Sequence, residues 1–242
     1  MPNPPRPQPI ALRIELLEVA PLVWRRVLVS NQWTLASLHG YFQWVMGWTD
    51  SHAHEFQIGG GIVAPDWWIH EADFDIDTSQ YRDERRVSVA AVVSELGAGG
   101  EFVYRYDMGD GWRHRIVIES LPRIAETQDL SLPVCLAGEN ACPPEDVGGP
   151  GGYGLLLEIL ADWEHEQHED MVRWIGGAFD PKGFDLNRLN RDFSARKRRR
   201  RLGPTAEAML PKPRGAARRL RASSPVDVLA SFVSPIRCES LH

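Results

Sequence analysis

Residues 101–121, EFVYRYDMGDGWRHRIVIESL, indicate the fold more directly than any other stretch of the chain. Apolar or aromatic residues alternate with charged ones on both sides of residues 109–111, a Gly-Asp-Gly sequence typical of tight turns. The stretch therefore predicts a hairpin of two antiparallel strands. In the second strand Trp112 and His114 share one face with apolar residues, because alternate side chains of a strand point the same way.

The flanking sequence contains further strands and helices. Alternation typical of strands occurs over three ranges, 11–19, 23–29 and 52–58. Helical spacing of apolar residues occurs over five ranges, 34–48, 88–97, 153–163, 168–176 and 185–193. For residues 66–86 we expect a strand and a polar loop. Strands dominate the first part of the chain and helices the last, which predicts an α+β fold, an antiparallel sheet with hairpins packed against several helices.

Composition and charge divide the chain into one domain and two appendages. Residues 1–9 are proline-rich and are interpreted as an extended leader. Residues 1–195 carry 15 Lys and Arg against 30 Asp and Glu, a net charge of −15, whereas residues 196–242 carry 12 against 3, a net charge of +9. We therefore expect a single folded domain over residues 10–195 and a basic, largely disordered tail over residues 196–242.

The overall composition is typical of a soluble globular protein. Hydrophobic residues make up 43% of the chain, and its nine tryptophans indicate a sizeable core. No apolar run approaches the roughly 20 residues that span a bilayer, and the first residues lack the basic-then-apolar order of a signal peptide. We therefore expect a cytoplasmic protein with no membrane partner, in which Cys135, Cys142 and Cys238 are reduced thiols.

Polar groups suited to chemistry gather near the predicted strand ends. His52, His54 and His114 each follow a turn or helix end and share a strand face with apolar residues. Such histidines are also typical of a core, where a carbonyl or carboxylate satisfies them. Two aspartates in the hairpin turn could orient an imidazole, and two prolines fix the direction of the acidic pair that follows them. We expect these groups to line one cleft: His52, His54, Asp107, Asp110, Trp112, His114, Glu145 and Asp146.

A divalent metal such as zinc is the cofactor that these side chains suggest. Imidazole nitrogen and thiolate sulfur are its usual ligands. The candidate ligands are His52, His54, His114, Cys135 and Cys142. However, six residues separate the two cysteines, a wider spacing than in most structural zinc sites. The alternative interpretation is a pair of small buried side chains flanking a turn.

Two other motifs favour ordinary structural interpretations. Residues 149–154 have the glycine spacing of a dinucleotide fingerprint and precede a predicted helix. However, CPPED rather than an apolar strand comes before them, and Pro150 removes an amide donor, so a tight turn is favoured. Residues 73–84 place acids at calcium-loop positions, but Thr78 stands where such a loop needs glycine, so a solvated acidic face is favoured.

The basic tail suggests a nucleic-acid partner. Its first residues form a cationic run: Lys197, Arg198, Arg199, Arg200 and Arg201. No aromatic residues are interleaved with this run, so contacts from the tail would be weak and independent of base sequence. The tail could equally fold back on the acidic body.

Five motifs in one order give the chain a family resemblance. They are VWRRVLV, LHGYFQWVMGWTDSHAHEF, YRYDMGDGWRH, CLAGENACPPEDVGGPGGY and FDLNRLNRDF. Together they resemble the plasmid pRiA4b ORF-3-like family over roughly residues 10–195. The resemblance implies an α+β domain of bacteria, archaea and their mobile elements, some members being described as insertion-element passenger or resolvase-like proteins. Nothing in the chain resembles the catalytic domain of a serine recombinase. Many members have a further cysteine where Val147 stands, so a thiol-based site would be incomplete here.

Three functions fit these observations. The first is a non-enzymatic binding or accessory domain associated with mobile elements. The second is a metal-dependent hydrolase that uses the histidines together with Glu145 or Asp146. The third is a DNA-associated protein that acts through its tail. The sequence lacks a Walker loop and a G-x-S-x-G nucleophile elbow, so it gives no support to P-loop phosphoryl transfer or to α/β-hydrolase chemistry.

Overall fold

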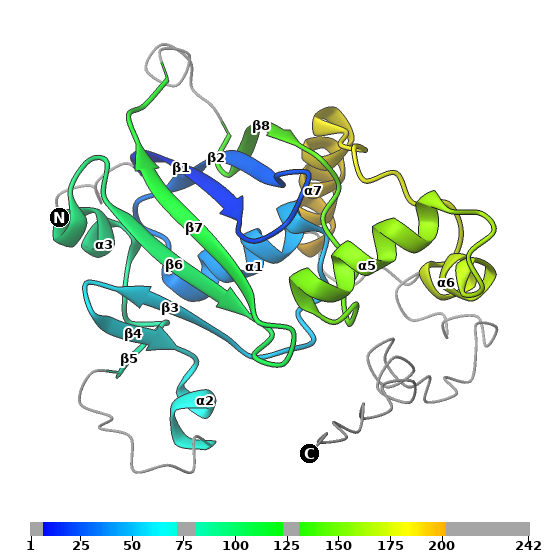
Figure 1. Ribbon diagram of the computed structural model, residues 1–242. Helices are drawn as coiled ribbons and strands as arrows, with labels where there is room; N and C mark the ends of the chain where they lie inside the picture. Colours follow the sequence, from blue (N-terminus) through cyan, green and yellow to red (C-terminus); the bar gives the residue numbers. More distant parts are fainter. Residues whose placement is uncertain (1–6, 72–80, 123–130, 202–242) are drawn as a thin grey trace, which may run out of the picture.

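The fold is built on one eight-stranded sheet, seen in a computed structural model that describes residues 7–71, 81–122 and 131–201 (Figure 1). The strand order is β5-β4-β3-β6-β7-β1-β2-β8, and every pairing is antiparallel except that of β4 with β5. The strands are β1 Pro9–Leu16, β2 Trp24–Ser30, β3 His54–Ile58, β4 Gly61–Ala64, β5 Tyr81–Asp83, β6 Glu101–Tyr106, β7 Trp112–Glu119 and β8 Val134–Glu139. The predicted α+β class is confirmed.

The helices of the described residues accompany this sheet. They are α1 Leu35–Met46, α2 Asp66–Glu71, α3 Val89–Leu96, α5 Gly149–Ala161, α6 His168–Ile175 and α7 Leu186–Arg201. Local sequence explains the ends of α1. Thr34 accepts a hydrogen bond from the Ser37 amide, which satisfies a free donor of the first turn, and Gly47 ends the helix in the left-handed conformation.

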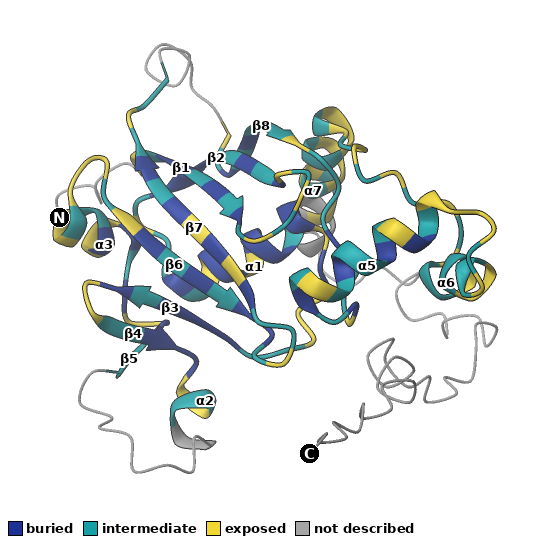
Figure 2. Cartoon of the chain, in the orientation of Figure 1, coloured by how far each residue is buried: buried dark blue, intermediate teal, exposed yellow. Residues whose placement is uncertain are grey.

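The predicted hairpin of β6 and β7 lies in the middle of the sheet. Tyr106 faces Trp112, and Tyr104 faces His114, across the two strands. Figure 2 shows the alternation along β7, where buried side chains face the core and exposed ones face solvent. Helix α1 covers the buried face, and its Phe42 ring meets Tyr104 edge-on with centroids 5.3 Å apart. The hairpin therefore fixes the core on one face and carries its turn to one end of the sheet.

Two segments differ from expectation. Residues 66–71 form helix α2 rather than a strand, because Pro65 offers its carbonyl to the amides of Trp68 and Ile69. Asp66 favours the same end of the helix electrostatically. Strand β8 was not predicted, and it pairs with β2 on both sides of a register shift between Arg26 and Val27. Both elements depend on hydrogen bonds that periodicity alone does not report.

Helix α7 continues through the expected domain boundary at residue 195. Leu189 and Phe193 pack against the core, and Asn190 exchanges two hydrogen bonds with the backbone of Cys135, at 3.0 Å and 2.8 Å. The helix therefore covers the outer edge of β8, and it ends at Arg201. The division into leader, domain and tail stays a prediction. Residues 72–80, which contain most of the acidic calcium-like motif, lie outside the described residues. No helix among residues 7–71, 81–122 and 131–201 has the length and apolarity needed to cross a bilayer.

Candidate functional site

The turn between β6 and β7 supplies the first part of the site. Asp107 has a left-handed backbone with φ of 56°, and its amide donates to the Ala53 carbonyl at 2.9 Å. Its Oδ1 accepts hydrogen bonds from the amides of Gly109 at 3.0 Å and Asp110 at 3.2 Å. Asn and Asp adopt such turns readily because their side chains bond the backbone two residues on. The turn thus fixes the Asp107 carboxylate through Oδ1, while Oδ2 takes no part in the hydrogen bonds of the turn.

The acidic turn before α5 supplies the second part. Asp146 has φ of 61° and Gly149 has φ of 68°. The two turns meet where Asp110 Oδ2 accepts from the Gly148 amide at 3.2 Å. A Cβ atom on Gly149 would lie 2.2 Å from the Asp110 carbonyl oxygen, so only glycine permits this approach. The tight turn expected at residues 149–154 is therefore wrong in its place, because these residues form the first turns of α5 and the turn lies just before them. The close approach at Gly149 brings Asp146 towards the hairpin.

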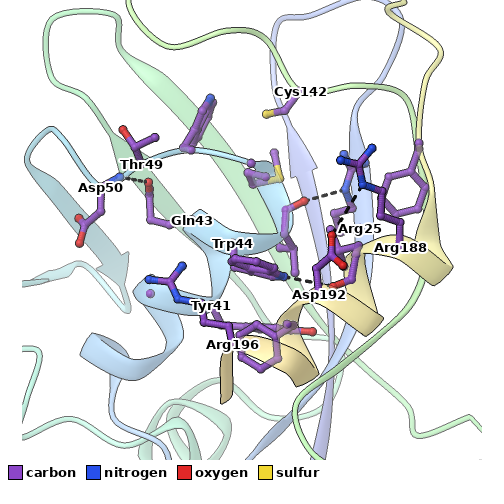
Figure 3. Close-up of a pocket in the computed structure, with 18 of the residues that line it drawn as sticks. Arg25, Tyr41, Gln43, Trp44, Thr49, Asp50, Cys142, Arg188, Asp192 and Arg196 are labelled. Carbon is purple, nitrogen blue, oxygen red and sulfur yellow. Dashed lines mark hydrogen bonds and ion pairs between the residues drawn. The ribbon is translucent and has the colours of Figure 1, made fainter. Parts of the chain in front are cut away.

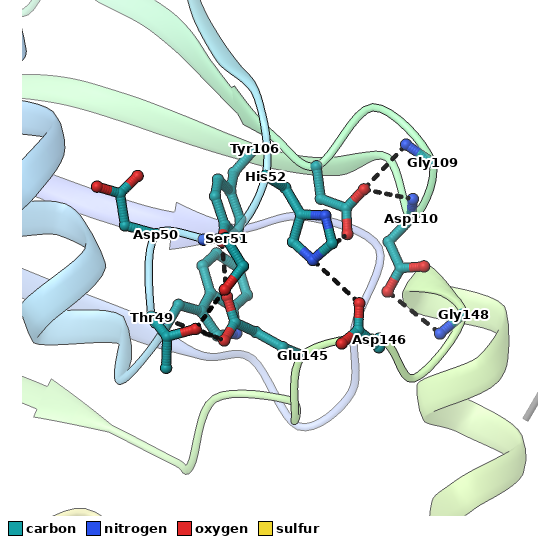
Figure 4. A network of polar contacts seen from close by, with 12 residues as sticks. Thr49, Asp50, Ser51, His52, Tyr106, Gly109, Asp110, Glu145, Asp146 and Gly148 are labelled. Atoms are coloured by element: carbon teal, nitrogen blue, oxygen red, sulfur yellow. Dashed lines mark hydrogen bonds and ion pairs between the residues drawn. The ribbon is translucent and has the colours of Figure 1, made fainter. Parts of the chain in front are cut away.

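His52 joins these two turns (Figure 4). Its Nε2 lies 3.0 Å from Asp146 Oδ1 and 3.5 Å from Asp107 Oδ2. Neither contact has hydrogen-bond geometry, so this buried nitrogen has no hydrogen-bond partner. We call His52, Asp107 and Asp146 the rim triad. The Asp146 side chain is 62% exposed and that of Asp107 10%, so the triad opens to solvent on one side.

The rim triad has the dimensions of a cation site. One ligand atom from each residue lies within 4.8 Å of the other two. Nitrogen and oxygen ligands lie about 2.0–2.2 Å from a bound zinc ion, so neighbouring ligands are separated by about 3.0–3.5 Å. Both measured distances fall in that range. One imidazole and two carboxylates would suit zinc or a harder divalent ion such as Mn²⁺, and three ligands leave coordination positions open.

Glu145 has a different position in the network. Tyr106 donates its hydroxyl to Oε1 at 2.6 Å, while the amide of Thr49 donates to Oε2 at 3.1 Å and the hydroxyl of Thr49 also bonds that oxygen. The Tyr106 oxygen in turn accepts from the Ser51 amide at 3.0 Å. Burial raises the pKa of Tyr106, so it stays a donor. Glu145 therefore ties the loop that carries His52 to the acidic turn.

Asp110 is a partly buried carboxyl group next to the triad. Burial raises its pKa, as do the charges of Asp107 and Asp146, whereas bonds from the amides of Gly148 and Gly149 oppose the shift. A carboxyl with a raised pKa is a stronger base when ionised, which suits proton transfer beside a cation site.

A second cluster lies behind the triad and includes residues that sequence reasoning missed. The rings of His39 and His54 stack 3.4 Å apart with an angle of 1° between their planes. His39 Nε2 lies 2.7 Å from Asp50 Oδ1, and His54 Nε2 lies 2.7 Å from Glu84 Oε2. These atoms include another group close enough to hold an ion, formed by His39, Asp50 and His54.

Hydrogen bonds account for the His39 side of this cluster. Asp50 donates its amide to Gln43 Oε1 at 3.0 Å, so Gln43 presents its NH₂ group to the Tyr104 oxygen at 3.0 Å. Tyr104 must then donate its own hydroxyl to His39 Nδ1, 2.8 Å away. His39 Nε2 consequently carries a hydrogen and donates it to Asp50. Burial, followed by the neighbouring His54, lowers the pKa of His39 to about 4, which keeps the ring neutral.

His114 and Trp112 are core residues. His114 is fully buried, its Nδ1 donates to the Tyr104 carbonyl at 3.2 Å, and burial lowers its pKa to about 4. Trp112 packs near Trp48, with ring centroids 5.8 Å apart. The expected single cleft is therefore divided. His52, Asp107, Asp110, Glu145 and Asp146 come together, His54 belongs to the stacked pair, and His114 and Trp112 lie in the core.

The cysteines lie apart from both histidine clusters. Cys135 is buried on β8 and donates to the Ala137 carbonyl at 3.4 Å, while Cys142 is partly buried. Burial raises the pKa of the Cys135 thiol to about 11 and also raises that of Cys142, despite the nearby Arg25. Among the described side chains, neither cysteine belongs to a group close enough to share an ion. The proposed five-residue ligand set does not converge.

His39 was the residue that sequence reasoning could have found. It follows Leu35 by four residues and precedes Phe42 by three, which places it on the apolar stripe of the predicted helix. A polar side chain on a buried stripe signals a hydrogen-bonded partner elsewhere in the fold. Gln43, four residues after His39 on the same buried helix face, carried the same signal. Asp50 and Glu84 did not, because neither lies on a predicted apolar stripe.

Fold and site together define the class of protein, an α+β domain with a polar site where the central hairpin meets the α5 turn. The family model for plasmid pRiA4b ORF-3-like proteins matches residues 8–188, so the chain belongs to that family. It is 38% identical over 202 residues to uncharacterized protein y4hQ of Sinorhizobium fredii (strain NBRC 101917 / NGR234), which covers 79% of this chain and 97% of the relative. It is also similar to the crystal structure of protein of unknown function MM3350 from Methanosarcina mazei Go1, with 32% identity and a TM-score of 0.62. The match covers 76% of this chain and 98% of that one. The relatives thus support the fold and leave the reaction open.

Proposed function

We propose that this protein is a binding domain that holds one divalent cation in the rim triad and uses the cation's open positions to engage an oxygen-bearing ligand. The observation that carries the proposal is the buried Nε2 of His52, which lies between two carboxylate oxygens without a hydrogen bond. A buried polar nitrogen without a hydrogen bond is costly, and a cation bound to the neutral imidazole would satisfy it together with both carboxylates.

The surroundings of the triad support a preformed site. Asp107 is fixed by two amides of its own turn, and Glu145 ties the His52 loop to the Asp146 turn. Second-shell hydrogen bonds of this kind hold metal ligands in the correct orientation. The stacked pair is the less favourable site, because His39 Nε2 carries a hydrogen that is already donated to Asp50.

Titration of the purified full chain with Zn²⁺, Mn²⁺ and Mg²⁺ after treatment with chelator tests the proposal. We expect one ion per chain, with binding weakened at least about tenfold by Asp107→Asn or His52→Ala. Asp107→Asn keeps an oxygen for the Gly109 and Asp110 amides, so the turn is preserved. Asp83→Asn is the matched control, because Asp83 Oδ1 also accepts from an amide two residues on and lies outside the triad.

The proposal fails if none of the three ions binds, or if Asp107→Asn and Asp83→Asn bind an ion equally well. If a second of these ions replaces the first and His52→Ala weakens its binding equally, the proposal is supported. The association with mobile elements that the family resemblance implies stays a prediction.

Hydrolysis is the second candidate function, and Asp110 is the observation that favours it. A divalent ion polarises water and an electrophilic oxygen. Asp110, whose pKa is raised by burial, stands beside Asp107 and Asp146 and could accept the proton of an attacking water. Metal-dependent turnover of a generic phosphodiester or ester that is lost in Asp110→Asn, with ion binding retained, would favour an enzyme. Ion binding without turnover would favour a binding domain.

A further inference from the structure

A groove runs between α1 and α7 (Figure 3). Its volume is about 1440 Å³, larger than the roughly 300–1,000 Å³ of a typical small-molecule pocket. Thr49 and Asp50 line one end. Thr49 bonds Glu145, the residue before Asp146, so this end of the groove adjoins the acidic turn that carries one residue of the triad.

Aromatic side chains form much of the groove wall. Trp44 packs edge-on against Phe193 with centroids 5.6 Å apart, and Tyr41 packs against Phe193 at 5.1 Å. Trp33 and Phe184 also line the groove. A wall of this kind offers flat apolar surface to planar groups, which a nucleobase can use in any sequence because every base has a π-face.

Helix α7 adds positive charge to the same groove. Arg188 and Arg196 lie eight residues apart, so both fall on one side of the helix. The Arg188 side chain is 73% exposed, and the Arg196 guanidinium lies 5.3 Å from the centre of the Trp44 ring. The helix continues through Lys197–Arg201, five further basic residues. Helix α7 therefore places two arginines, Arg188 and Arg196, along the aromatic wall.

The other charges of the groove leave these two arginines available. Arg25 donates four hydrogen bonds to backbone carbonyls, so its guanidinium has a structural role. Asp185 accepts from the Arg188 amide at 2.9 Å, and Asp50 is bonded by His39. Asp192 lies 3.7 Å from Arg188 in an exposed pair, and such a pair contributes little stability and exchanges readily for another anion.

We propose that this groove binds single-stranded nucleic acid, with bases against the Trp44 wall, phosphates at Arg188 and Arg196, and the strand directed towards the rim triad. The last part rests on the proposed function, because it makes a phosphate oxygen the ligand of the triad's cation. Stacking requires unpaired bases, which favours single strands over a duplex. Cations alone would also suit an acidic peptide, but such a peptide has no planar groups for the aromatic wall.

Fluorescence anisotropy of the full chain with a labelled oligothymidine, in chelator, tests the groove separately from the cation. We expect the double substitution Arg188→Ala and Arg196→Ala to weaken binding roughly tenfold and to reduce the slope of log affinity against log salt by roughly 0.7 for each lost phosphate contact. Arg173→Ala is the matched control, since Arg173 on α6 is 74% exposed and paired with Asp170. Arg173→Ala should change the slope by less than the roughly 0.7 expected for one phosphate contact.

Trp44→Leu tests the stacking wall, with Trp163→Leu as its control because Trp163 is 78% exposed and does not line the groove. We expect Trp44→Leu alone to weaken binding roughly fivefold or more. Equal binding of oligothymidine by wild type and by the groove variants would overturn the proposal. So would equal affinity for a duplex, or displacement of the oligonucleotide by polyglutamate at equal charge. Oligouridine in place of oligothymidine distinguishes RNA from DNA as the ligand.

The two proposals fail in different ways. If the groove variants lose oligonucleotide binding but no ion binds the triad, the groove stands and the proposed function falls. If Asp107→Asn loses the ion while the groove variants still bind the oligonucleotide normally, the proposed function stands and the groove proposal falls. If both stand, adding Mn²⁺ should tighten oligonucleotide binding to the wild type and leave binding to Asp107→Asn unchanged.

Discussion

His52 Nε2 lies 3.0 Å from Asp146 Oδ1, although the two residues belong to loops far apart in the chain. The contact exists because two turns with left-handed residues, at Asp107 and at Asp146, meet on either side of one imidazole. Aspartate tolerates a left-handed backbone better than most residues, because its side chain bonds the backbone nearby. The two turns therefore bring both carboxylates to one imidazole.

Gly149→Ala should lower the free energy of unfolding by about 1–3 kcal/mol or more. The new Cβ would lie 2.2 Å from the Asp110 carbonyl oxygen, and φ there is +68°. Gly154→Ala is the control on the same helix, because a Cβ there meets nothing within 4 Å. It should be neutral or stabilising by about 0.5–1 kcal/mol. Urea unfolding measures both, and equal effects would show that the two turns do not meet as described.

Much of the sheet was predictable because its patterns are local. The alternation of residues 101–121 reports burial on one face, and the hairpin forms in that register. The positions of α1 and α3 were also predictable from helical spacing, and each helix begins at a residue that caps it, Thr34 or Ser88. Helix α2 and strand β8 were not, because each depends on a partner elsewhere in the chain or on a single carbonyl.

The candidate site was predictable only as a set of residue types. Parity placed His52 and His54 on one strand face, yet β3 begins at His54. His52 lies in the preceding loop, where parity does not apply, and turns towards Asp146 instead. His39 joins His54 through a helix–sheet contact that no periodicity encodes. The groove was invisible to sequence because it arises where α7 docks on α1.

The stability of the protein should fall as pH decreases from about 6.5 towards 4. His39 and His114 are buried with pKa values lowered to about 4, while in the unfolded chain their pKa values are about 6.5. Between these values the unfolded chain binds more protons, so stability is lost on acidification. The expected loss between pH 7 and pH 5 is about 2 kcal/mol for each histidine.

Urea unfolding at several pH values checks this dependence. His114→Asn keeps a donor for the Tyr104 carbonyl but removes the titrating ring, so the pH slope should fall by about half even if the variant is less stable. His165→Asn is the control, because His165 is only partly buried in the connection before α6, and an Asn oxygen can accept from the Gln167 amide as its Nδ1 does. A slope unchanged in His114→Asn would contradict a neutral buried imidazole.

A chain that ends after Arg201 should fold as the full chain does, whereas one that ends after Asp185 should not melt cooperatively. The first keeps helix α7. The second removes Leu189, Phe193 and Asn190, which uncovers Trp44 and the outer edge of β8. Circular dichroism with thermal melting compares the two chains. A cooperative melt of the shorter chain would show that α7 is not part of the folded domain, and it would leave the groove without one wall.

Tyr104→Phe and Tyr153→Phe should have opposite effects, although both remove a hydroxyl from a buried ring. The Tyr104 oxygen accepts from Gln43 and donates to His39, so its loss leaves two buried groups unsatisfied and should cost about 1–3 kcal/mol of unfolding free energy. The Tyr153 hydroxyl is buried without a partner, so its removal should be neutral or slightly stabilising. Because Gln43 also holds the Asp50 amide in the loop before His52, Tyr104→Phe should further weaken ion binding at the rim triad about twofold to tenfold. Urea unfolding and ion titration of both variants measure the two effects. If Tyr104→Phe lowers stability but binds the ion as the wild type does, the hydrogen-bonded cluster supports the core alone and the His52 loop is held by Glu145.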